Sequence, residues 1–293
     1  MRIIFQNLLI DKRKTVKKLF ILASFLAIFT IKTTENRADS RIEEKHIVVV
    51  TASYNNKKWY KKNLDSVFNQ NYKNWRLIYI DDCSTDGTGD LVETYIQEKG
   101  FQNQVTLIKN KKRVGSPLGN QYYAIHSCKD TDIIIILDGD DWLAHDHVFS
   151  YINNVYQDPS VWLTYGTFKE HPSGKVRNYC KPVPLEIVTH NAFREFKFIP
   201  THLRTFYAGL FKKINKKDLQ HNGKIIKMAG DLAAMFPMLE MAQYNFKFIP
   251  DILLIYNSNT GSNHHTINQA LQTSNNKKIR KKKRYNPIES PFK

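Results

Sequence analysis

Short apolar runs alternate with amphipathic segments along much of this chain, and that alternation restricts the folds open to it. Five runs are predicted to be buried strands: His46–Thr51, Trp75–Ile80, Gln104–Ile108, Asp132–Leu137 and Val161–Tyr165. Between them, the spacing of apolar residues predicts four helices: Lys57–Asn69, Thr88–Lys99, Leu118–Ser127 and His147–Tyr156. Strands and helices that alternate at these lengths form βαβ units. We therefore expect an α/β fold, with a mostly parallel sheet flanked by helices.

The chain after this alternation is less regular. Four prolines interrupt residues 166–227, at positions Pro172, Pro182, Pro184 and Pro200. Beyond them, Met228–Ala242 is predicted to be a helix interrupted near Pro237, and Phe246–Ile249 and Ile252–Tyr256 are predicted to be short strands. The sequence therefore predicts one folded domain over residues 46–260.

The two ends of the chain differ from this domain. Residues 1–18 are basic, residues 19–31 are apolar, and residues 32–45 form a polar linker. Residues 261–293 form a polar and basic tail, with seven basic residues in Lys277–Arg284, and we expect this tail to be disordered. At about 1.5 Å per residue, the apolar run is roughly 20 Å long, shorter than the ~30 Å core of a bilayer.

A short apolar run after basic residues is typical of a signal-peptide core or a short signal anchor. We expect an uncleaved anchor, with the N-terminus on the cytoplasmic side and the protein associated with a membrane. Two alternatives stay open: a cleaved signal would give a secreted or lumenal protein, and a helix of a soluble domain would give a cytoplasmic one.

The net charge of +17 first suggests a nucleic-acid-binding protein. Most of this charge comes from the two basic ends, so residues 19–276 are only mildly basic. A broad binding face for nucleic acid is therefore not expected. The basic tail is instead a second candidate for contact with an anionic membrane. The three cysteines are too few and too scattered for a disulfide scaffold or a zinc cluster, and are expected to be free thiols.

Polar residues gather where the predicted strands end. Residues 52–56 follow the first strand, residues 81–88 the second and residues 138–141 the fourth. In open sheets of this type, ligands bind beyond the carboxyl ends of the strands. Asp138, Asp140 and Asp141 repel one another unless a cation or solvent compensates them. Hard ions such as Mg²⁺ and Mn²⁺ prefer oxygen ligands, so this cluster predicts a metal site. An Asp-rich turn that caps the next helix is the alternative, but one cap does not need three carboxylates.

The sequence contains neither a phosphate-binding P-loop nor a dinucleotide-binding fingerprint. Lys112 and Arg113 nevertheless precede a predicted helix start, which is a favourable place for contact with phosphate. A solvated basic loop is the alternative interpretation.

Taken together, these motifs resemble glycosyltransferase family 2, nucleotide-sugar transferases of the GT-A fold. The segments that carry the resemblance are Val48–Asn55, Asp81–Thr88 and Asp138–Asp141. It implies a Rossmann-like nucleotide-binding half and an acceptor-binding half. The nucleotide-sugar, a UDP-sugar as our first expectation, would contact the loop that contains Ala52, Ser53 and Tyr54. By the same resemblance Asp82 contacts the base, Asp138 lies near the ribose and Gly139 contacts the nucleotide-sugar. Asp140 with Asp141 holds Mn²⁺ or Mg²⁺ at the diphosphate.

The resemblance extends less closely to the C-terminal part of the chain. Asp231 matches the catalytic base of inverting members, although Gly230 replaces the usual Glu, and a helix N-cap is the alternative role for Asp231. Gly119 stands where the family often has Arg, which leaves the phosphate contact to Arg113. At the spacing of the usual metal-ligating His this chain has Asn259. His264 and His265 follow a few residues later, and His264 is our candidate ligand, with an exposed loop as the alternative.

We therefore expect a metal-dependent, inverting glycosyltransferase that moves a sugar to a hydroxyl group of a glycan, lipid or protein acceptor. A sugar nucleotidyltransferase would share the nucleotide-binding architecture, but the glycine-rich start usual for that class is absent after the first strand. A third hypothesis, a non-catalytic protein that binds anionic polymers or nucleic acid, explains only the two basic ends of the chain.

Overall fold

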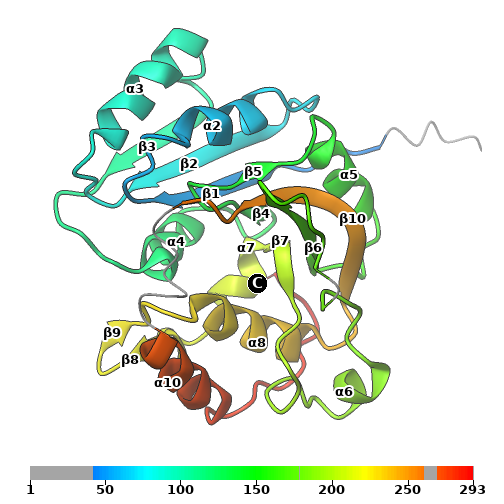
Figure 1. The fold of residues 1–293 in the computed structure, drawn as a ribbon. Helices are drawn as coiled ribbons and strands as arrows, with labels where there is room; N and C mark the ends of the chain where they lie inside the picture. Colours follow the sequence, from blue (N-terminus) through cyan, green and yellow to red (C-terminus); the bar gives the residue numbers. More distant parts are fainter. Residues whose placement is uncertain (1–41, 178, 261–268, 293) are drawn as a thin grey trace, which may run out of the picture. The chain divides into compact units, whose positions relative to one another are not determined.

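The computed structural model describes residues 42–177, 179–260 and 269–292. The chain divides into a short unit, Met1–Glu43, and a large unit, Glu44–Lys293, which holds all the elements discussed below. An eight-stranded sheet runs through the large unit in the order β3-β2-β1-β4-β7-β6-β10-β5 (Figure 1). The strands of this sheet are β1 (Ile47–Ser53), β2 (Trp75–Asp81), β3 (Val105–Lys109), β4 (Ile133–Ile136), β5 (Trp142–Leu143), β6 (Leu163–His171), β7 (Thr201–Tyr207) and β10 (Phe246–Asn257). Two short strands, β8 (Gln220–His221) and β9 (Lys224–Ile225), form a separate hairpin.

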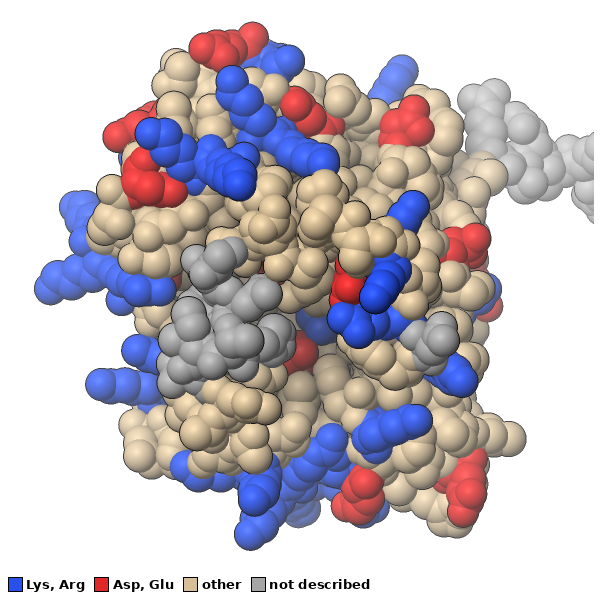
Figure 2. Space-filling model, in the orientation of Figure 1, with Lys and Arg blue, Asp and Glu red and all other residues tan. Residues whose placement is uncertain are grey.

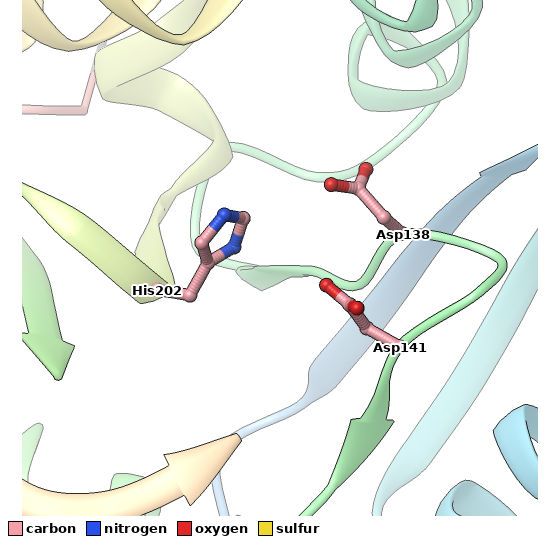
Figure 3. Close-up of side chains that lie close together, drawn as sticks. All are labelled: Asp138, Asp141 and His202. Carbon is pink, nitrogen blue, oxygen red and sulfur yellow. The ribbon is translucent and has the colours of Figure 1, made fainter. Parts of the chain in front are cut away.

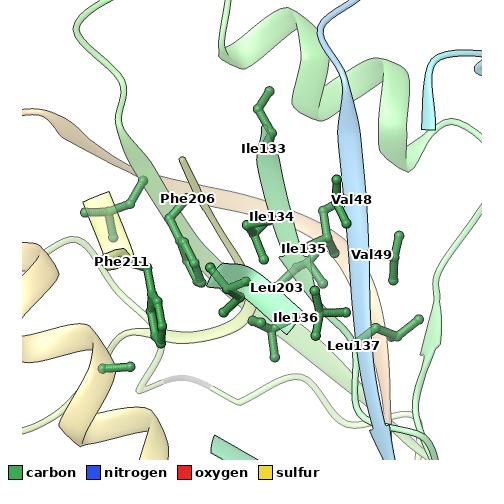
Figure 4. Close-up of a cluster of buried hydrophobic side chains, with 14 of the residues drawn as sticks. Val48, Val49, Ile133, Ile134, Ile135, Ile136, Leu137, Leu203, Phe206 and Phe211 are labelled. Atoms are coloured by element: carbon green, nitrogen blue, oxygen red, sulfur yellow. The ribbon is translucent and has the colours of Figure 1, made fainter. Parts of the chain in front are cut away.

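One half of the sheet is the parallel arrangement that the alternation predicts. Strand β1 pairs in parallel with β2 and with β4, and β2 pairs in parallel with β3. Val48–Val50 and Ile133–Ile136 are buried throughout because helices cover this part of the sheet on both faces. Figure 4 shows Val48, Val49 and Ile133–Ile136 packed with Leu203, Phe206 and Phe211. The predicted α/β fold with a mostly parallel sheet is confirmed.

The other half contains strands that the sequence analysis did not predict. Strand β7 is antiparallel to both β4 and β6, and β5 is antiparallel to β10. The two short strands predicted within Phe246–Tyr256 are parts of one strand, β10, which is parallel to β6 and has two irregularities in its register. Because Ile136 pairs with Arg204, the start of β7 extends past the end of β4. This register brings residues 201–204 to the edge where the aspartate cluster lies.

Helices cover both faces of the sheet. Figure 1 shows α2 and α3 on one side and α4, α7 and α8 on the other, with α10 beside α8. The helices are α2 (Tyr60–Phe68), α3 (Thr88–Lys99), α4 (Pro117–His126), α5 (Val148–Val155), α6 (Leu185–Thr189), α7 (Ala208–Lys212), α8 (Gly230–Ala242) and α10 (Gln269–Arg280), with a 3₁₀ turn at Lys216–Leu219. Four predicted helices match α2, α3, α4 and α5 within a few residues at each end, and Pro237 lies inside α8 without ending it.

The C-terminal tail differs from the prediction. Residues 269–280 form α10, and Ile279 is almost fully buried, while Ile288 and Phe292 pack against the core. The basic residues are used as donors: Lys282 donates to the carbonyl oxygens of Lys217, Asp218 and Gln220 at 2.7–3.1 Å. The prediction of a disordered tail is therefore wrong for residues 269–292, because its few apolar side chains reach the core while the cations satisfy main-chain carbonyls.

The predictions for residues 1–18 and 19–31, and for the first ten residues of the 32–45 linker, lie outside the described residues. Within the described part of the chain, no helix is both long enough and apolar enough to span a membrane. Cys83, Cys128 and Cys180 are free, as expected.

Candidate active site

A cleft of about 540 Å³ opens at the carboxyl ends of β1 and β4. Figure 2 shows a hollow in this face of the molecule, with acidic side chains inside it. The sequence-predicted residues that line the cleft are Ala52, Ser53, Tyr54, Asp82, Arg113, Asp138, Asp140 and Asp231. The fold therefore brings most of the predicted site residues to one place, although they span 180 positions of the sequence.

The loop after β1 forms the floor of the cleft. The hydroxyl of Ser53 is buried and accepts hydrogen bonds from Tyr79 Oη at 2.9 Å and from Asn56 Nδ2 at 3.0 Å. The Gly139 N–H donates to the Ala52 carbonyl oxygen, so the two loops approach closely. A Cβ at position 139 would lie 2.6 Å from Ser53 Oγ, which leaves room only for glycine. Ser53 and Gly139 thus set the spacing of the two loops.

Asp82 holds a neighbouring loop in place. Its carboxylate accepts hydrogen bonds from the N–H of Val114 at 2.9 Å, from the N–H of Gly115 at 2.8 Å and from Asn110 Nδ2 at 2.8 Å. Burial alone would raise the pKa of Asp82, but these hydrogen bonds lower it below its ordinary value. An ionised Asp82 therefore fixes residues 113–115, which form one wall of the cleft.

Arg113 lies on that wall beside Tyr54. Its guanidinium carbon is 3.5 Å from the centre of the Tyr54 ring, which is a cation–π contact. Both side chains line the cleft. A cation and an aromatic face are thus placed together beside the aspartate cluster.

The loop that carries the aspartates is tied to α2. Asn63, buried in α2, donates through Nδ2 to the carbonyl oxygen of Asp138 at 3.0 Å and to that of Asp141 at 2.7 Å. The N–H of Asn257 donates to Asp141 Oδ1 at 2.8 Å. Asp141 is only 1% exposed, and its Oδ2 has no hydrogen-bond partner among the described residues. Burial raises the pKa of Asp138, Asp140 and Asp141, and that of Asp140 is raised to about 7, with repulsion from Asp138 adding to the effect.

His202, at the start of β7, completes a possible cation site. One ligand atom from each of Asp138, Asp141 and His202 lies within 4.8 Å of the others, and Figure 3 shows these side chains facing one another. Two carboxylate oxygens and one imidazole nitrogen are donors suited to Mn²⁺. The unpartnered buried oxygen of Asp141 also fits a ligand at this point, so these residues fit a divalent ion.

This group differs from the predicted ligands. Asp141 is in it, but Asp140 instead faces the cleft, and His264 lies outside the described residues. His202 was not predicted as a site residue because four prolines interrupt the pattern of residues 166–227. The signal was present in Thr201–Tyr207, which is rich in threonine and aromatic residues and fits a strand.

Asp231 lines the cleft at the start of α8. Its Oδ2 is 3.2 Å from Arg204 Nη2 on β7, and its Oδ1 accepts from the N–H of Leu232 at 3.0 Å. The N-cap position belongs to Ala229, whose side chain makes no capping hydrogen bond, and Asp231 lies two residues after it. The structure therefore does not place Asp231 at the N-cap, which was its alternative role. Arg204 was not predicted either, and it also attracts Asp138 and Asp141.

Comparisons with known sequences all match this chain to glycosyltransferases. A sequence model described as "Glycosyl transferase family 2" matches residues 48–219, more than half of the chain. The putative glycosyltransferase EpsE of Bacillus subtilis (strain 168) is 34% identical over 97 residues, which are 32% of this chain and 33% of EpsE. The putative teichuronic acid biosynthesis glycosyltransferase TuaG of the same organism is 41% identical over 49 residues, which are 17% of this chain and 19% of TuaG. The chain thus aligns with a third or less of the length of these two relatives.

Solved structures share the fold at low sequence identity. S. aureus TarS 1-349 in complex with UDP-GlcNAc superposes with a TM-score of 0.56 at 18% identity, over 74% of this chain and 60% of that one. The mannosyltransferase PcManGT from Pyrobaculum calidifontis, in complex with GDP-Man and Mn²⁺, gives a TM-score of 0.54 at 18% identity, over 83% of this chain and 66% of that one. These likenesses confirm the predicted GT-A-type fold.

Proposed function

Because this chain belongs to glycosyltransferase family 2, we propose that it is a metal-dependent, inverting glycosyltransferase that moves a sugar from a nucleotide-sugar to an acceptor hydroxyl group. A UDP-sugar is our first expectation for the donor, in keeping with the UDP-GlcNAc complex of TarS. The observation that carries the proposal is the cleft itself. It brings Asp138, Asp140, Arg113 and Tyr54 together with the carboxylate of Asp231 in one site.

The donor is proposed to bind between the β1 loop and the wall formed by residues 113–115. Tyr54 offers an aromatic face to a nucleobase, and Arg113 offers a positive charge to a phosphate. Asp82 supports this wall through the N–H groups of Val114 and Gly115, so its contribution to donor binding includes holding the wall in shape. Asp140 faces the same cleft and is available to the donor.

We propose that Asp138, Asp141 and His202 hold a divalent ion, Mn²⁺ or Mg²⁺. When bound, such an ion acts as a Lewis acid that withdraws negative charge from a diphosphate leaving group. The residues of the chain prepare this site without it: Asn63 and the N–H of Asn257 fix the loop and one oxygen of Asp141, and they leave the other oxygen directed at the cluster.

Asp231 is proposed as the general base. Its carboxylate accepts the proton of the acceptor hydroxyl group while the acceptor oxygen forms a bond to the anomeric carbon of the sugar. The bond from that carbon to the diphosphate breaks, and the nucleoside diphosphate leaves with the electron pair. We propose that the acceptor oxygen attacks from the face opposite the leaving group, which inverts the anomeric configuration, because Asp231 matches the catalytic base of inverting members of the family.

A thermal-shift screen of the full chain tests the donor and metal together. UDP-, GDP- and dTDP-sugars are compared with and without Mn²⁺, since a ligand that binds only the folded state raises the melting temperature. We expect a rise with a UDP-sugar that is large only when Mn²⁺ is present and that EDTA abolishes. A full shift in EDTA would reject the metal requirement, and no shift with any nucleotide-sugar would reject the donor class.

We further propose that residues 19–31 attach the protein to a membrane, because the apolar run follows a basic segment. Fractionation of cells that express the full chain, compared with a chain that lacks residues 1–31, tests this. Equal amounts of both proteins in the soluble fraction would contradict it.

A further inference from the structure

Strand β7 delivers a second polar residue to the cleft besides His202. His202 and Arg204 both line the cleft, two residues apart at the start of β7. The side chain of Arg204 is only 10% exposed, and it lines the cleft. A buried guanidinium retains its charge, so this residue is a fixed positive charge inside a site rich in aspartates.

The contacts of Arg204 converge on one carboxylate. Its Nη2 lies 3.2 Å from Asp231 Oδ2, and its Nε donates a long hydrogen bond of 3.4 Å to the carbonyl oxygen of Pro200. The other oxygen of Asp231 accepts from the N–H of Leu232. Both oxygens of Asp231 are therefore held, one from the start of α8 and one from β7, while the side chain stays 34% exposed toward solvent.

The surrounding charges explain why such a partner is needed. Asp231 and Asp138 repel each other, and Arg204 attracts both Asp138 and Asp141. Without Arg204, repulsion would favour a rotamer of Asp231 that points away from the aspartate cluster. The other cations that line the cleft, Arg113 and Lys227, have no ion pair with Asp231 within 4.0 Å in the described structure.

We propose that Arg204 is the positioning residue of this enzyme: it holds the carboxylate of Asp231 toward the acceptor side of the cleft. The inference rests on the proposed role of Asp231 as the base. In this role Arg204 acts through Asp231 and contributes little to binding of the donor. Two other roles are separable by experiment, namely direct contact with the donor phosphates and support of the fold alone.

A double-mutant cycle distinguishes these roles. Arg204→Gln, Asp231→Asn and the double variant are compared in the full chain, by UDP release from the donor found in the thermal-shift screen with p-nitrophenyl glycosides as acceptors. We expect Asp231→Asn to slow transfer by roughly 10²–10⁴-fold, the usual contribution of a general base. Arg204→Gln should slow it by about 10- to 100-fold, as expected when a hydrogen bond to a charged group is lost. In the Asp231→Asn background, Arg204→Gln should change the rate less than about twofold, because interacting residues are not additive.

Four further measurements complete the test. The affinity for UDP should stay within about twofold of wild type in Arg204→Gln, since the side chain is not assigned to the donor. Arg204→Lys should recover part of the rate because it keeps the charge. Arg204→Met, which removes the charge and keeps much of the bulk, replaces Arg204→Gln in the cycle if the latter does not fold. Arg76→Gln is the matched control, because Arg76 is a partly buried arginine near an aspartate at the opposite end of the strands, and it should leave transfer unchanged. A crystal structure of Arg204→Gln should show the Asp231 carboxylate rotated away from its present position.

The outcomes separate this inference from the proposed function. A normal rate for Asp231→Asn would remove the base, and the positioning role with it. A slow Asp231→Asn beside a normal Arg204→Gln would overturn the positioning role alone. Weakened binding of UDP, or an unchanged effect of Arg204→Gln in the Asp231→Asn background, would reassign Arg204 to the donor.

Discussion

The buried pair between Arg194 and Glu240 gives a sharp test of how the C-terminal tail is held. The side chains are 2% and 0% exposed, and Arg194 Nε and Nη2 donate to the two carboxylate oxygens of Glu240 at 2.5 and 2.8 Å. Each partner also holds the tail. Arg194 Nη1 donates to the carbonyl oxygen of Ile279 at 2.6 Å, and the N–H of Tyr285 donates to Glu240 Oε2 at 3.0 Å.

Arg194→Met would leave Glu240 buried without its positive partner. Loss of one member of a buried ion pair costs about 3–5 kcal/mol. At about 2–4 °C per kcal/mol for a domain of this size, the melting temperature should fall by roughly 6–20 °C. Replacing both residues, as Arg194→Met with Glu240→Leu, should recover much of this loss, because no unpaired charge stays buried. Recovery should be incomplete, since the Ile279 carbonyl and the Tyr285 N–H lose their partners.

Thermal unfolding followed by circular dichroism measures these differences, and limited trypsin digestion at Lys281–Arg284 reports release of the tail. The matched control is Arg284→Gln, which breaks the exposed pair between Arg284 and Glu195 and should cost at most about 1 kcal/mol. If Arg194→Met melts within a degree or two of Arg284→Gln, the pair does not hold the tail and this explanation is refuted.

Three further predictions follow from the cleft and the sheet. Gly139→Ala should lower the free energy of unfolding in urea by about 1–3 kcal/mol, because its Cβ would clash with Ser53 and with Asn56 Nδ2, and Ser53→Gly in the same chain should restore only part of the loss because it also removes the acceptor of the Tyr79 hydroxyl. Asp82→Asn, with one acceptor oxygen in place of two, should speed amide hydrogen exchange of residues 114–115, and unchanged exchange there would show that Asp82 does not hold this loop. The pKa of Asp132 is lowered because hydrogen bonds from the His46 ring and the Lys129 N–H outweigh the effect of burial. Its stabilisation should therefore be complete above the ordinary carboxyl pKa of about 3.9 and be lost as pH falls below it, so the gap in melting temperature between wild type and Asp132→Asn should shrink in acid.

The parallel half of the sheet could be predicted because each of its strands is a continuous apolar run. Val48–Val50 and Ile133–Ile136 are apolar at every position, and this pattern predicts strands that are buried on both faces, as they are in the structure. The motifs at the ends of these strands then follow from topology, since parallel strands present their carboxyl ends at one edge. This is why Tyr54, Asp82, Asp138 and Asp140 were predicted at the cleft that the structure has.

The antiparallel half could not be predicted in the same way. Strand β7 lies between β4 and β6 in the sheet. Its pairing with β4 joins residues 204–207 to residues 133–136, and no local sequence pattern predicts a pairing between segments so far apart in the chain. His202 and Arg204 come to the site only through this long-range register. The tail was misjudged for a related reason: its composition is that of a disordered segment, but Ile279 and Phe292 find apolar contacts that exist only in the folded domain.

The stereochemistry of transfer tests the central claim most directly. The full chain is incubated with Mn²⁺, an α-linked UDP-sugar and an acceptor glycoside, and the anomeric proton of the product is followed by ¹H NMR from the first minutes of the reaction. We predict a β-linked product formed together with UDP, and formation of that product slowed by roughly 10²–10⁴-fold in an Asp231→Asn reaction. An α-linked product, or release of UMP in place of UDP, would contradict this prediction.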